Sequence, residues 1–354
     1  MGDFFKNFVE DLKDEDTSIA ADGQSAGEFS GTVDTGSYML NALLSGSLHG
    51  GIPNNKITAF AGESATGKTY FVLGIMKAFL DSNPEAGVMF YDTEAAVTKA
   101  MMEERGIDVS RVIISEPQTI QEFRSHALKS IDLFQQTPED KRPPFMFVLD
   151  SLGLLSTTKE MEDIADGKET RDMTKAQVIK AAFRVLTLKL AKAKIPMLVT
   201  NHVYEVIGSY IPMKEMGGGT GLKYAASTIV YLGKKKERDN TTREIVGNII
   251  KATTYKSRLS KENATAEVLL RYDSGLDKYH GLVDLAIDAG LFEKAGSRIK
   301  VAGKSVYQKQ IMADPELYFT EDVMEALESH VKERFSYGSG SEMASEDISS
   351  EESA

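Results

Sequence analysis

The most constraining feature of this sequence is a glycine-bounded segment that joins an apolar run to a helical repeat. The apolar run, residues 57–61, is typical of a buried strand, and apolar residues after position 70 recur at helical spacing. In this setting the amides of the loop can cradle phosphates at a helix N-terminus. The sequence therefore predicts a nucleoside triphosphate site, in preference to a glycine turn before a surface helix. The candidate nucleotide-binding residues in this segment are Gly62, Glu63, Ser64, Ala65, Thr66, Gly67, Lys68, Thr69 and Tyr70.

Three side chains in and near this loop have distinct expected roles. Lys68 would contact the outer phosphates, and the Thr69 hydroxyl would hold Mg²⁺. Asp150 ends the apolar strand 145–150. An acid at the carboxyl edge of a parallel sheet can reach a metal held by Thr69 through a water. The alternative is that Asp150 caps a following helix, but beside a phosphate loop the metal role is favoured.

Glu94 lies two residues after the end of the apolar strand 87–92. A carboxylate there could polarise the water that attacks the γ-phosphate, because this displacement needs a positioned base. Glu94 or Asp92 could instead cap the helix that we expect to begin near Val97. Spacing alone leaves both roles open.

Composition excludes several classes of protein. The 354 residues are 42% hydrophobic and 27% charged, as in a soluble globular protein. We expect a cytoplasmic protein with no membrane partner, because the sequence has no long apolar span and no cleavable signal. The absence of cysteine excludes disulfides and thiolate metal sites. A net charge of −12 argues against a generally basic nucleic-acid binder, so any such binding must be local.

Strand and helix patterns alternate from about residue 37 to 275. A long helix is expected over 173–194, a loop over 202–221, and late strands over 228–232, 245–255 and 266–272, the first ending in a turn at 233–236. This alternation predicts an α/β fold with a mostly parallel sheet and helices on both faces. The closing hairpins predict antiparallel additions to that sheet.

The chain divides into four expected parts. Residues 1–35 form an amphipathic arm and a linker, and the arm either folds back onto its own core or docks on a neighbouring copy. Residues 36–278 form the core, and 279–337 form a small C-terminal domain. Residues 338–354 form an acidic, disordered tail, which is either a solvated end or a competitor for the path of a nucleic acid.

An ordered set of motifs resembles one family. GESATGKT at 62–69, DTE at 92–94, VLDS at 148–151, TNH at 200–202, MGGGTGLKYAAS at 216–227 and YKSR at 255–258 are similar to RecA-type recombinases. The DTE, TNH and GGGTG variants are most similar to the UvsX-type recombinases of tailed bacteriophages. The resemblance runs from about residue 36 to 334.

This resemblance implies a RecA-like phosphate-loop core and a DNA-dependent ATPase that uses ATP and Mg²⁺. It also implies self-assembly into helical filaments on single-stranded DNA, followed by homologous pairing and strand exchange with double-stranded DNA. Such proteins serve recombination, repair and replication, with a single-strand-binding protein and a recombination mediator as partners. Glu94 becomes the catalytic carboxylate by this resemblance.

Four more site residues follow from the same resemblance. His202 stands where bacterial members usually carry glutamine and phage members carry histidine, and its implied role is to sense the γ-phosphate and set the following loop. Met101 stands where members often stack an aromatic ring on adenine; a thioether can still pack on a purine. Lys256 and Arg258 match a basic pair that crosses to the neighbour's γ-phosphate. In an extended run their side chains would share one face.

Two loops are expected to bind DNA by the same resemblance. The loop at 202–221 holds apolar residues suited to wedging between bases and glycine amides that can approach phosphates. The alternative for this segment is an ordinary loop packed under the core. A first DNA loop is expected near 159–173, among many acidic residues. The candidate DNA-binding residues are Lys168, Arg171, Val206, Ile207, Tyr210, Lys214, Gly217, Gly218, Gly219 and Lys223.

Two other functions compete with the recombinase. One is a ring-forming, hexameric DNA helicase with the same core fold, which would translocate on DNA instead of pairing it. The other is a non-enzymatic accessory paralogue that scaffolds filaments. The presence of Lys68, Glu94 and Asp150 together argues against the scaffold.

Overall fold

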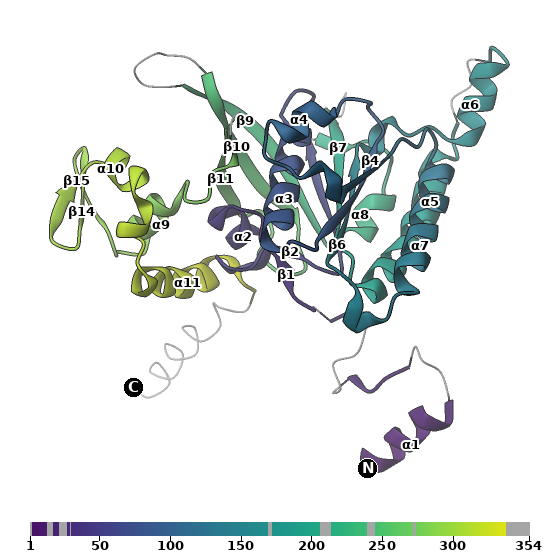
Figure 1. Ribbon diagram of the computed structural model, residues 1–354, viewed down its shortest axis with the longest axis horizontal. Helices are drawn as coiled ribbons and strands as arrows, with labels where there is room; N and C mark the ends of the chain where they lie inside the picture. Colours follow the sequence, from purple (N-terminus) through teal and green to yellow (C-terminus); the bar gives the residue numbers. More distant parts are fainter. Residues whose placement is uncertain are drawn as a thin grey trace, which may run out of the picture.

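A mixed β-sheet runs through the centre of the molecule (Figure 1). The computed structural model describes residues 2–12, 17–20, 27–28, 30–168, 172–205, 214–238, 245–271 and 274–337. Within these residues ten strands form the central sheet. They are β3 (Ile57–Gly62), β4 (Gly87–Asp92), β5 (Val112–Ser115), β6 (Phe145–Asp150), β7 (Met197–Glu205), β8 (Lys214–Met216), β9 (Thr228–Arg238), β10 (Ile245–Lys256), β11 (Thr265–Arg271) and β12 (Gly275–Leu276).

The parallel part of the sheet brings the expected functional strands together. The strand order is β12-β11-β10-β9-β3-β7-β6-β4-β5, and β8 pairs with β7. Every pair from β9 through β3, β7, β6 and β4 to β5 is parallel, whereas β9 to β12 are antiparallel neighbours. All six residues of β3 are buried, as expected for a strand covered on both faces. The carboxyl ends of β3, β4, β6 and β7 therefore lie along one edge.

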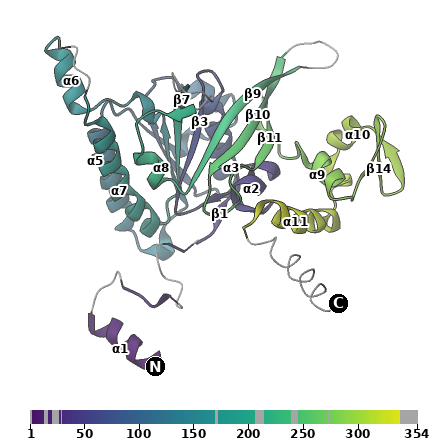
Figure 2. The same ribbon diagram turned by 180° about the vertical axis from the view of Figure 1, so that it is seen from behind.

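Helices cover both faces of this sheet, which confirms the predicted α/β class. The α-helices in the described part of the chain are α1 (Gly2–Leu12), α2 (Tyr38–Ser45), α3 (Lys68–Ser82), α4 (Lys99–Glu103), α5 (Ile120–Gln135), α6 (Thr158–Ala165), α7 (Lys175–Ala193), α8 (Gly221–Ala225), α9 (Leu282–Asp288), α10 (Gln308–Ala313) and α11 (Glu321–Phe335). Helices α2 and α3 pack on one face, seen in front in Figure 1. Helices α5, α7 and α8 pack on the other, seen in Figure 2.

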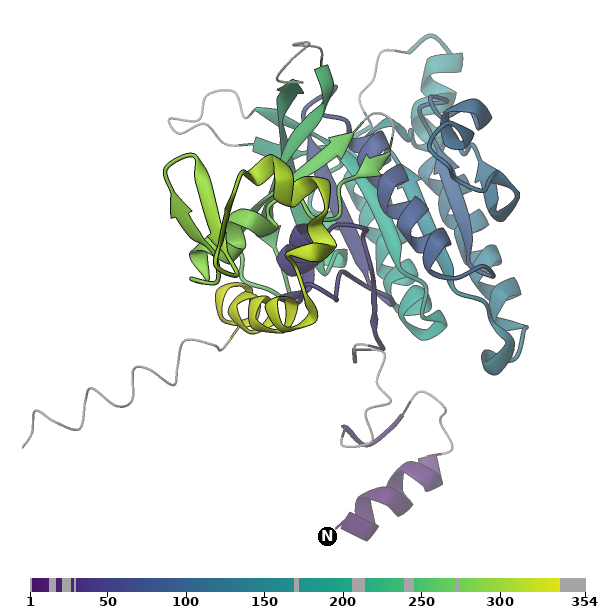
Figure 3. The same cartoon turned by 60° about the vertical axis from the view of Figure 1, so that its left-hand side comes forward.

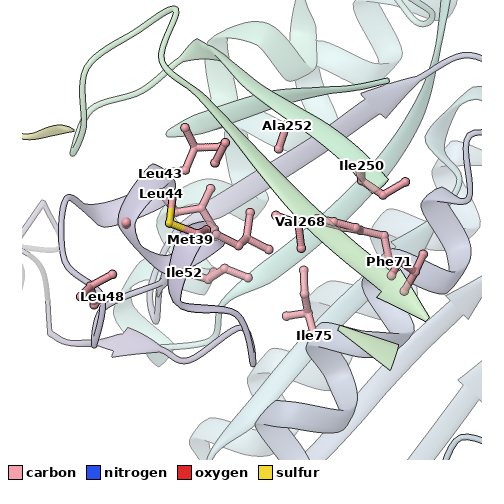
Figure 4. Packing of buried hydrophobic residues seen from close by; sticks show 14 of the residues in the cluster. Met39, Leu43, Leu44, Leu48, Ile52, Phe71, Ile75, Ile250, Ala252 and Val268 are labelled. Atoms are coloured by element: carbon pink, nitrogen blue, oxygen red, sulfur yellow. The ribbon is translucent and has the colours of Figure 1, made fainter. Parts of the chain in front are cut away.

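The packing on the α2 and α3 face is shown in Figure 4. Met39 and Leu43 of α2 meet Ala252 and Val268 of the antiparallel strands, and Phe71 of α3 lies beside them. The expected apolar face of α3 is confirmed, because Phe71, Ile75 and Phe79 are all buried. This helix begins directly after the phosphate loop, so its packing fixes the position of that loop against the sheet.

The C-terminal elements pack beside α2 and the antiparallel strands (Figure 3). They consist of α9, α10, α11 and a three-stranded sheet of β13 (Glu293–Ala295), β14 (Arg298–Val301) and β15 (Lys304–Val306). A two-stranded pair, β1 (Thr32–Val33) with β2 (Ile52–Pro53), precedes the core. Helix α1 lies apart from the sheet, and its Phe4 and Phe5 are 67% and 57% exposed.

Two local expectations were wrong. The expected turn at 233–236 lies inside β9, which runs on to Arg238 and pairs along its length with β10. Part of the expected loop at 202–221 is paired strand, because β7 continues to Glu205 and pairs with β8, while residues 206–213 lie outside the described residues. In both cases a partner strand supplies backbone hydrogen bonds, so the strand extends beyond what the local sequence predicts.

Candidate nucleotide and DNA sites

The phosphate loop places a buried lysine at the carboxyl edge of the sheet. Lys68 is 6% exposed, and its ammonium donates to the carbonyl oxygens of Gly62 at 3.1 Å and Glu63 at 3.0 Å. Burial lowers the pKa of Lys68, while the carboxylates of Glu94 and Asp150 act in the opposite direction. Gly67, at φ 94°, precedes the helix in a left-handed conformation that favours glycine.

Thr69 and Asp150, the two expected magnesium ligands, lie together at this edge. Asp150 is 2% exposed, and its carboxylate accepts hydrogen bonds from the hydroxyls of Thr69 and Thr200. Burial raises the pKa of Asp150, whereas these two hydrogen bonds lower it. A hydroxyl and a carboxylate are oxygen ligands of the kind Mg²⁺ takes when phosphates and waters complete its shell. The residues present therefore fit the ion.

The two acids after β4 have separate roles. Asp92 accepts backbone N–H groups of Glu94 at 3.1 Å and Val97 at 3.1 Å, so it caps the turn. Helix α4 begins later than expected, at Lys99, with Thr98 as its N-cap. Glu94 is half-buried, and its Oε1 accepts a hydrogen bond of 2.9 Å from Ser151 Oγ. Thr98 thus caps α4 and Asp92 holds the turn before it, so neither of these contacts requires the Glu94 side chain.

His202 connects the lysine to the glutamate. Its Nδ1 lies 3.3 Å from Lys68 Nζ, and its Nε2 lies 3.3 Å from Glu94 Oε1. The parallel register places His202 beside Gly62. His202 also belongs to β7, the first strand of the hairpin expected to bind DNA. One imidazole therefore touches both candidate groups of the nucleotide site and stands at the base of that hairpin.

Sequence reasoning missed the residues that hold Glu94 in place. Thr93 Oγ1 donates to the carbonyl oxygen of Ser151 at 2.7 Å and accepts from its N–H at 2.8 Å. Ser151 in turn donates to Glu94, so β4 and β6 are tied together behind the carboxylate. Thr200, which binds Asp150, was also missed. All three flank residues that the motifs had singled out, and this adjacency was the available signal.

Arg105 links Tyr70 of α3 to Met101 of α4. Met101 is in α4, and its carbonyl oxygen accepts a 2.7 Å hydrogen bond from Arg105 Nη1. The guanidinium carbon of Arg105 lies 4.4 Å from the centre of the Tyr70 ring. Arg105 had no role in the sequence prediction.

The first expected DNA loop is a short helical arm, α6, which projects from the sheet in Figure 1. Asp172 accepts a 2.6 Å hydrogen bond from Thr157 Oγ1 and closes the base of the arm. This hydroxyl and the Thr174 bonds lower the pKa of Asp172 to about 2. Lys168 pairs with Asp166 at 2.8 Å, and Arg171 lies outside the described residues.

The hairpin that replaces the second loop leads into α8 through a glycine turn. Val206, Ile207 and Tyr210 lie outside the described residues, whereas Lys214 is in β8. Gly218 and Gly219 have φ of 83° and 75°, and a Cβ on either would come within 2.9 Å of α7. The turn thus requires glycine for its fold, whatever the role of the Gly217, Gly218 and Gly219 amides toward DNA. Lys223 lies 4.0 Å from Glu215.

The expected basic pair is only partly on a strand. Strand β10 ends at Lys256, and Arg258 lies exposed in the following bend, so the shared strand face was wrong. The Lys256 ammonium donates to the carbonyl oxygens of Lys223 at 2.6 Å and Ala226 at 2.7 Å, with that of Tyr224 at 3.4 Å. It therefore caps the C-terminal end of α8. Burial, followed by the charge of Arg258, lowers the pKa of Lys256.

The sheet order, the loop and the acids at the strand ends define the chain as a phosphate-loop nucleotide-binding protein. Residues 11–277 match the RecA N-terminal domain family. The chain belongs to the RecA family.

Three curated relatives illustrate the relationship. The Recombination and repair protein of Enterobacteria phage T4 is 32% identical over 256 residues, covering 72% of this chain and 63% of that protein. Protein RecA of Thermus aquaticus is 27% identical over 303 residues, 85% of each chain. Protein RecA of Agrobacterium fabrum is 28% identical over 271 residues, covering 75% of this chain and 69% of that protein. The chain thus spans less than two thirds of the phage relative.

None of the helices in the described part of the chain is both long enough and apolar enough to cross a membrane.

Proposed function

We propose that this chain is an ATP-dependent DNA recombinase that assembles on single-stranded DNA and catalyses homologous pairing and strand exchange. The observation that carries the proposal is the contact of His202 with both Lys68 and Glu94. It joins the nucleotide site directly to the strand that enters the hairpin. Such a junction suits an ATPase whose turnover responds to DNA.

Each side chain of the site has a part in hydrolysis. Lys68 binds the outer phosphates, and Glu94 orients and deprotonates the attacking water. Thr69 and Asp150 would hold Mg²⁺, which when bound neutralises charge on the phosphates. Ser151 positions the Glu94 carboxylate through the hydrogen bond described above. His202 donates to the γ-phosphate once ATP replaces its present contact with Lys68.

Assembly and DNA binding complete the proposal. The core over residues 36–278 would carry the nucleotide and DNA sites, and the arm over 1–35 would dock on a neighbouring copy. The exposed Phe4 and Phe5 support the docked alternative, because a solitary amphipathic helix gains stability by covering its apolar face. The small domain would cover 279–337, and the acidic tail 338–354. A single-strand-binding protein and a mediator are the proposed protein partners, and the cytoplasm is the proposed compartment.

Negative-stain microscopy with single-stranded DNA tests this function. We expect extended helical filaments when a slowly hydrolysed ATP analogue is present and none when it is omitted. Lys68→Ala protein is the matched control and should form none under either condition, because it lacks the main cation for the phosphates. Closed rings together with polar unwinding activity would instead identify a helicase. Filaments without any ATP turnover would identify a scaffold.

A second prediction concerns the apolar residues between β7 and β8 in the sequence. Replacing Ile207 and Tyr210 by glycine should weaken single-strand binding by about tenfold or more, because wedged or stacked side chains contribute about 1–3 kcal/mol per base. Fluorescence anisotropy with labelled oligonucleotide measures this, and DNA-free nucleotide binding should stay intact. The salt dependence should be shallow and unchanged, since no phosphate contact is removed. Native DNA affinity in the double variant would rule out the wedge.

A further inference from the structure

Tyr70, in the first turn of α3, and Met101, in α4, both contact Arg105 and form one surface with it. Residues on a helix are about 100° apart, so Tyr70 leaves α3 nearly opposite to Lys68. Lys68 faces Glu94 and His202, where the γ-phosphate is attacked. The base of a nucleotide extends away from its γ-phosphate. Tyr70 therefore lies on the side of α3 away from the γ-phosphate contacts, the side to which we assign the ribose and base.

Arg105 is held in a fixed pose on this side of α3. Its guanidinium carbon is 4.4 Å from the Tyr70 ring centre, and Nη1 donates to the Met101 carbonyl oxygen at 2.7 Å. A guanidinium over an aromatic face is attracted by the ring and keeps its plane defined. In the described part of the chain, the hydrogen bonds of Arg105 engage Nη1, which leaves Nε and Nη2 for a ligand. The side chain is half-buried and Tyr70 is 39% exposed, so the surface is accessible.

We propose that Arg105, ordered by Tyr70 and by the Met101 carbonyl, is the specificity-determining residue for the nucleotide base and lets the site accept guanine as well as adenine. This inference rests on the nucleotide site of the proposed function. The face of a planar guanidinium can stack on either purine. The free donors of a guanidinium match the O6 and N7 acceptors of guanine, and they offer no acceptor to the amino group of adenine.

Calorimetric titration of the DNA-free, full-length chain with ADP and GDP tests the proposal without relying on turnover. In the native chain we expect the two dissociation constants to differ by less than about tenfold. Arg105→Ala should weaken GDP binding on the order of tenfold and ADP binding less. Arg105→Lys keeps the charge but loses the planar fork, so it should lose GDP affinity like Arg105→Ala. Tyr70→Phe keeps the ring and should behave as native.

Lys99→Ala is the matched control, because it removes an exposed cation from α4 that pairs only with Glu103 one turn away at 3.4 Å. Its affinities should be native, and a melting curve for each variant confirms folding. A native chain that binds ADP but rejects GDP by more than about a hundredfold would overturn the proposal, as would unchanged affinities in Arg105→Ala. If the native chain binds neither ADP nor GDP, the proposed ATPase site is refuted instead.

Discussion

Glu94→Gln protein is expected to bind ATP about as well as the native chain and to hydrolyse it on the order of a hundredfold more slowly, or worse. The amide preserves the shape of the carboxylate and can still accept the 2.9 Å hydrogen bond from Ser151. It cannot take a proton from the attacking water. The loss should therefore appear in kcat, with little change in nucleotide affinity. Steady-state hydrolysis on single-stranded DNA and calorimetric binding measure the two quantities separately.

Two further variants sharpen this test. Glu104→Gln changes an exposed glutamate in the same segment and should hydrolyse ATP normally. Ser151→Ala leaves the carboxylate but removes its hydrogen bond, so its loss should be smaller, and residual turnover should remain. Normal DNA-stimulated hydrolysis by Glu94→Gln would show that another group serves as the base.

Two inactive variants of the basic pair and of the phosphate loop are expected to restore hydrolysis when they are mixed. Lys256→Ala/Arg258→Ala protein keeps its own phosphate loop, and Lys68→Ala protein keeps its basic pair. If the pair reaches the neighbour's γ-phosphate, some mixed interfaces join an intact loop to an intact pair. In a random one-to-one filament with head-to-tail interfaces, about a quarter do so. A cation supplied across an interface can be worth about a thousandfold or more in rate, so this fraction is easily detected.

The decisive control carries all three substitutions in one chain. Mixed with the Lys256→Ala/Arg258→Ala protein, which keeps its phosphate loop, this triple variant offers no intact basic pair and should remain inactive. Light scattering should confirm that both mixtures assemble on DNA. If the first mixture assembles and stays as inactive as its components, the basic pair does not act across the interface, and its function is confined to its own chain.

The parts of the site that the sequence predicted correctly depend on short, contiguous patterns. Strands β4 and β6 have the expected bounds, because each is an apolar run that ends at an acidic residue. The phosphate loop follows the apolar strand β3, as its motif predicts. The contact between His202 and Glu94 joins residues 108 positions apart, so no local pattern contained it. His202 and Glu94 meet because the parallel strands β7 and β4 end at the same edge of the sheet.

The wrong predictions depend on pairing between distant segments. A run of lysines has low strand propensity, yet β9 passes through Lys234 and Lys235 because β10 pairs with it there. The glycines at 217–219 were interpreted from the sequence as phosphate-approaching amides, and no local pattern indicated that the turn at Gly218 and Gly219 rests on α7. Arg258 leaves the strand at an irregularity after Thr254, where the register with β9 shifts. Tertiary partners decided each of these cases.

If Lys256 acts on a neighbour's phosphate as proposed, the cap that it places on α8 makes assembly a competition between two sets of acceptors. An ammonium has three N–H bonds, and in the single chain they face the carbonyl oxygens of Lys223, Tyr224 and Ala226. A neighbour's phosphate could accept a hydrogen bond from Lys256 only by displacing at least one of these carbonyl oxygens. The C-terminal end of α8 would then lose its cation, and α8 directly follows the hairpin and its glycine turn. A ligand whose binding shifts α8 would then change the affinity of one protomer for the next. By thermodynamic reciprocity, assembly would change the affinity for that ligand by the same factor.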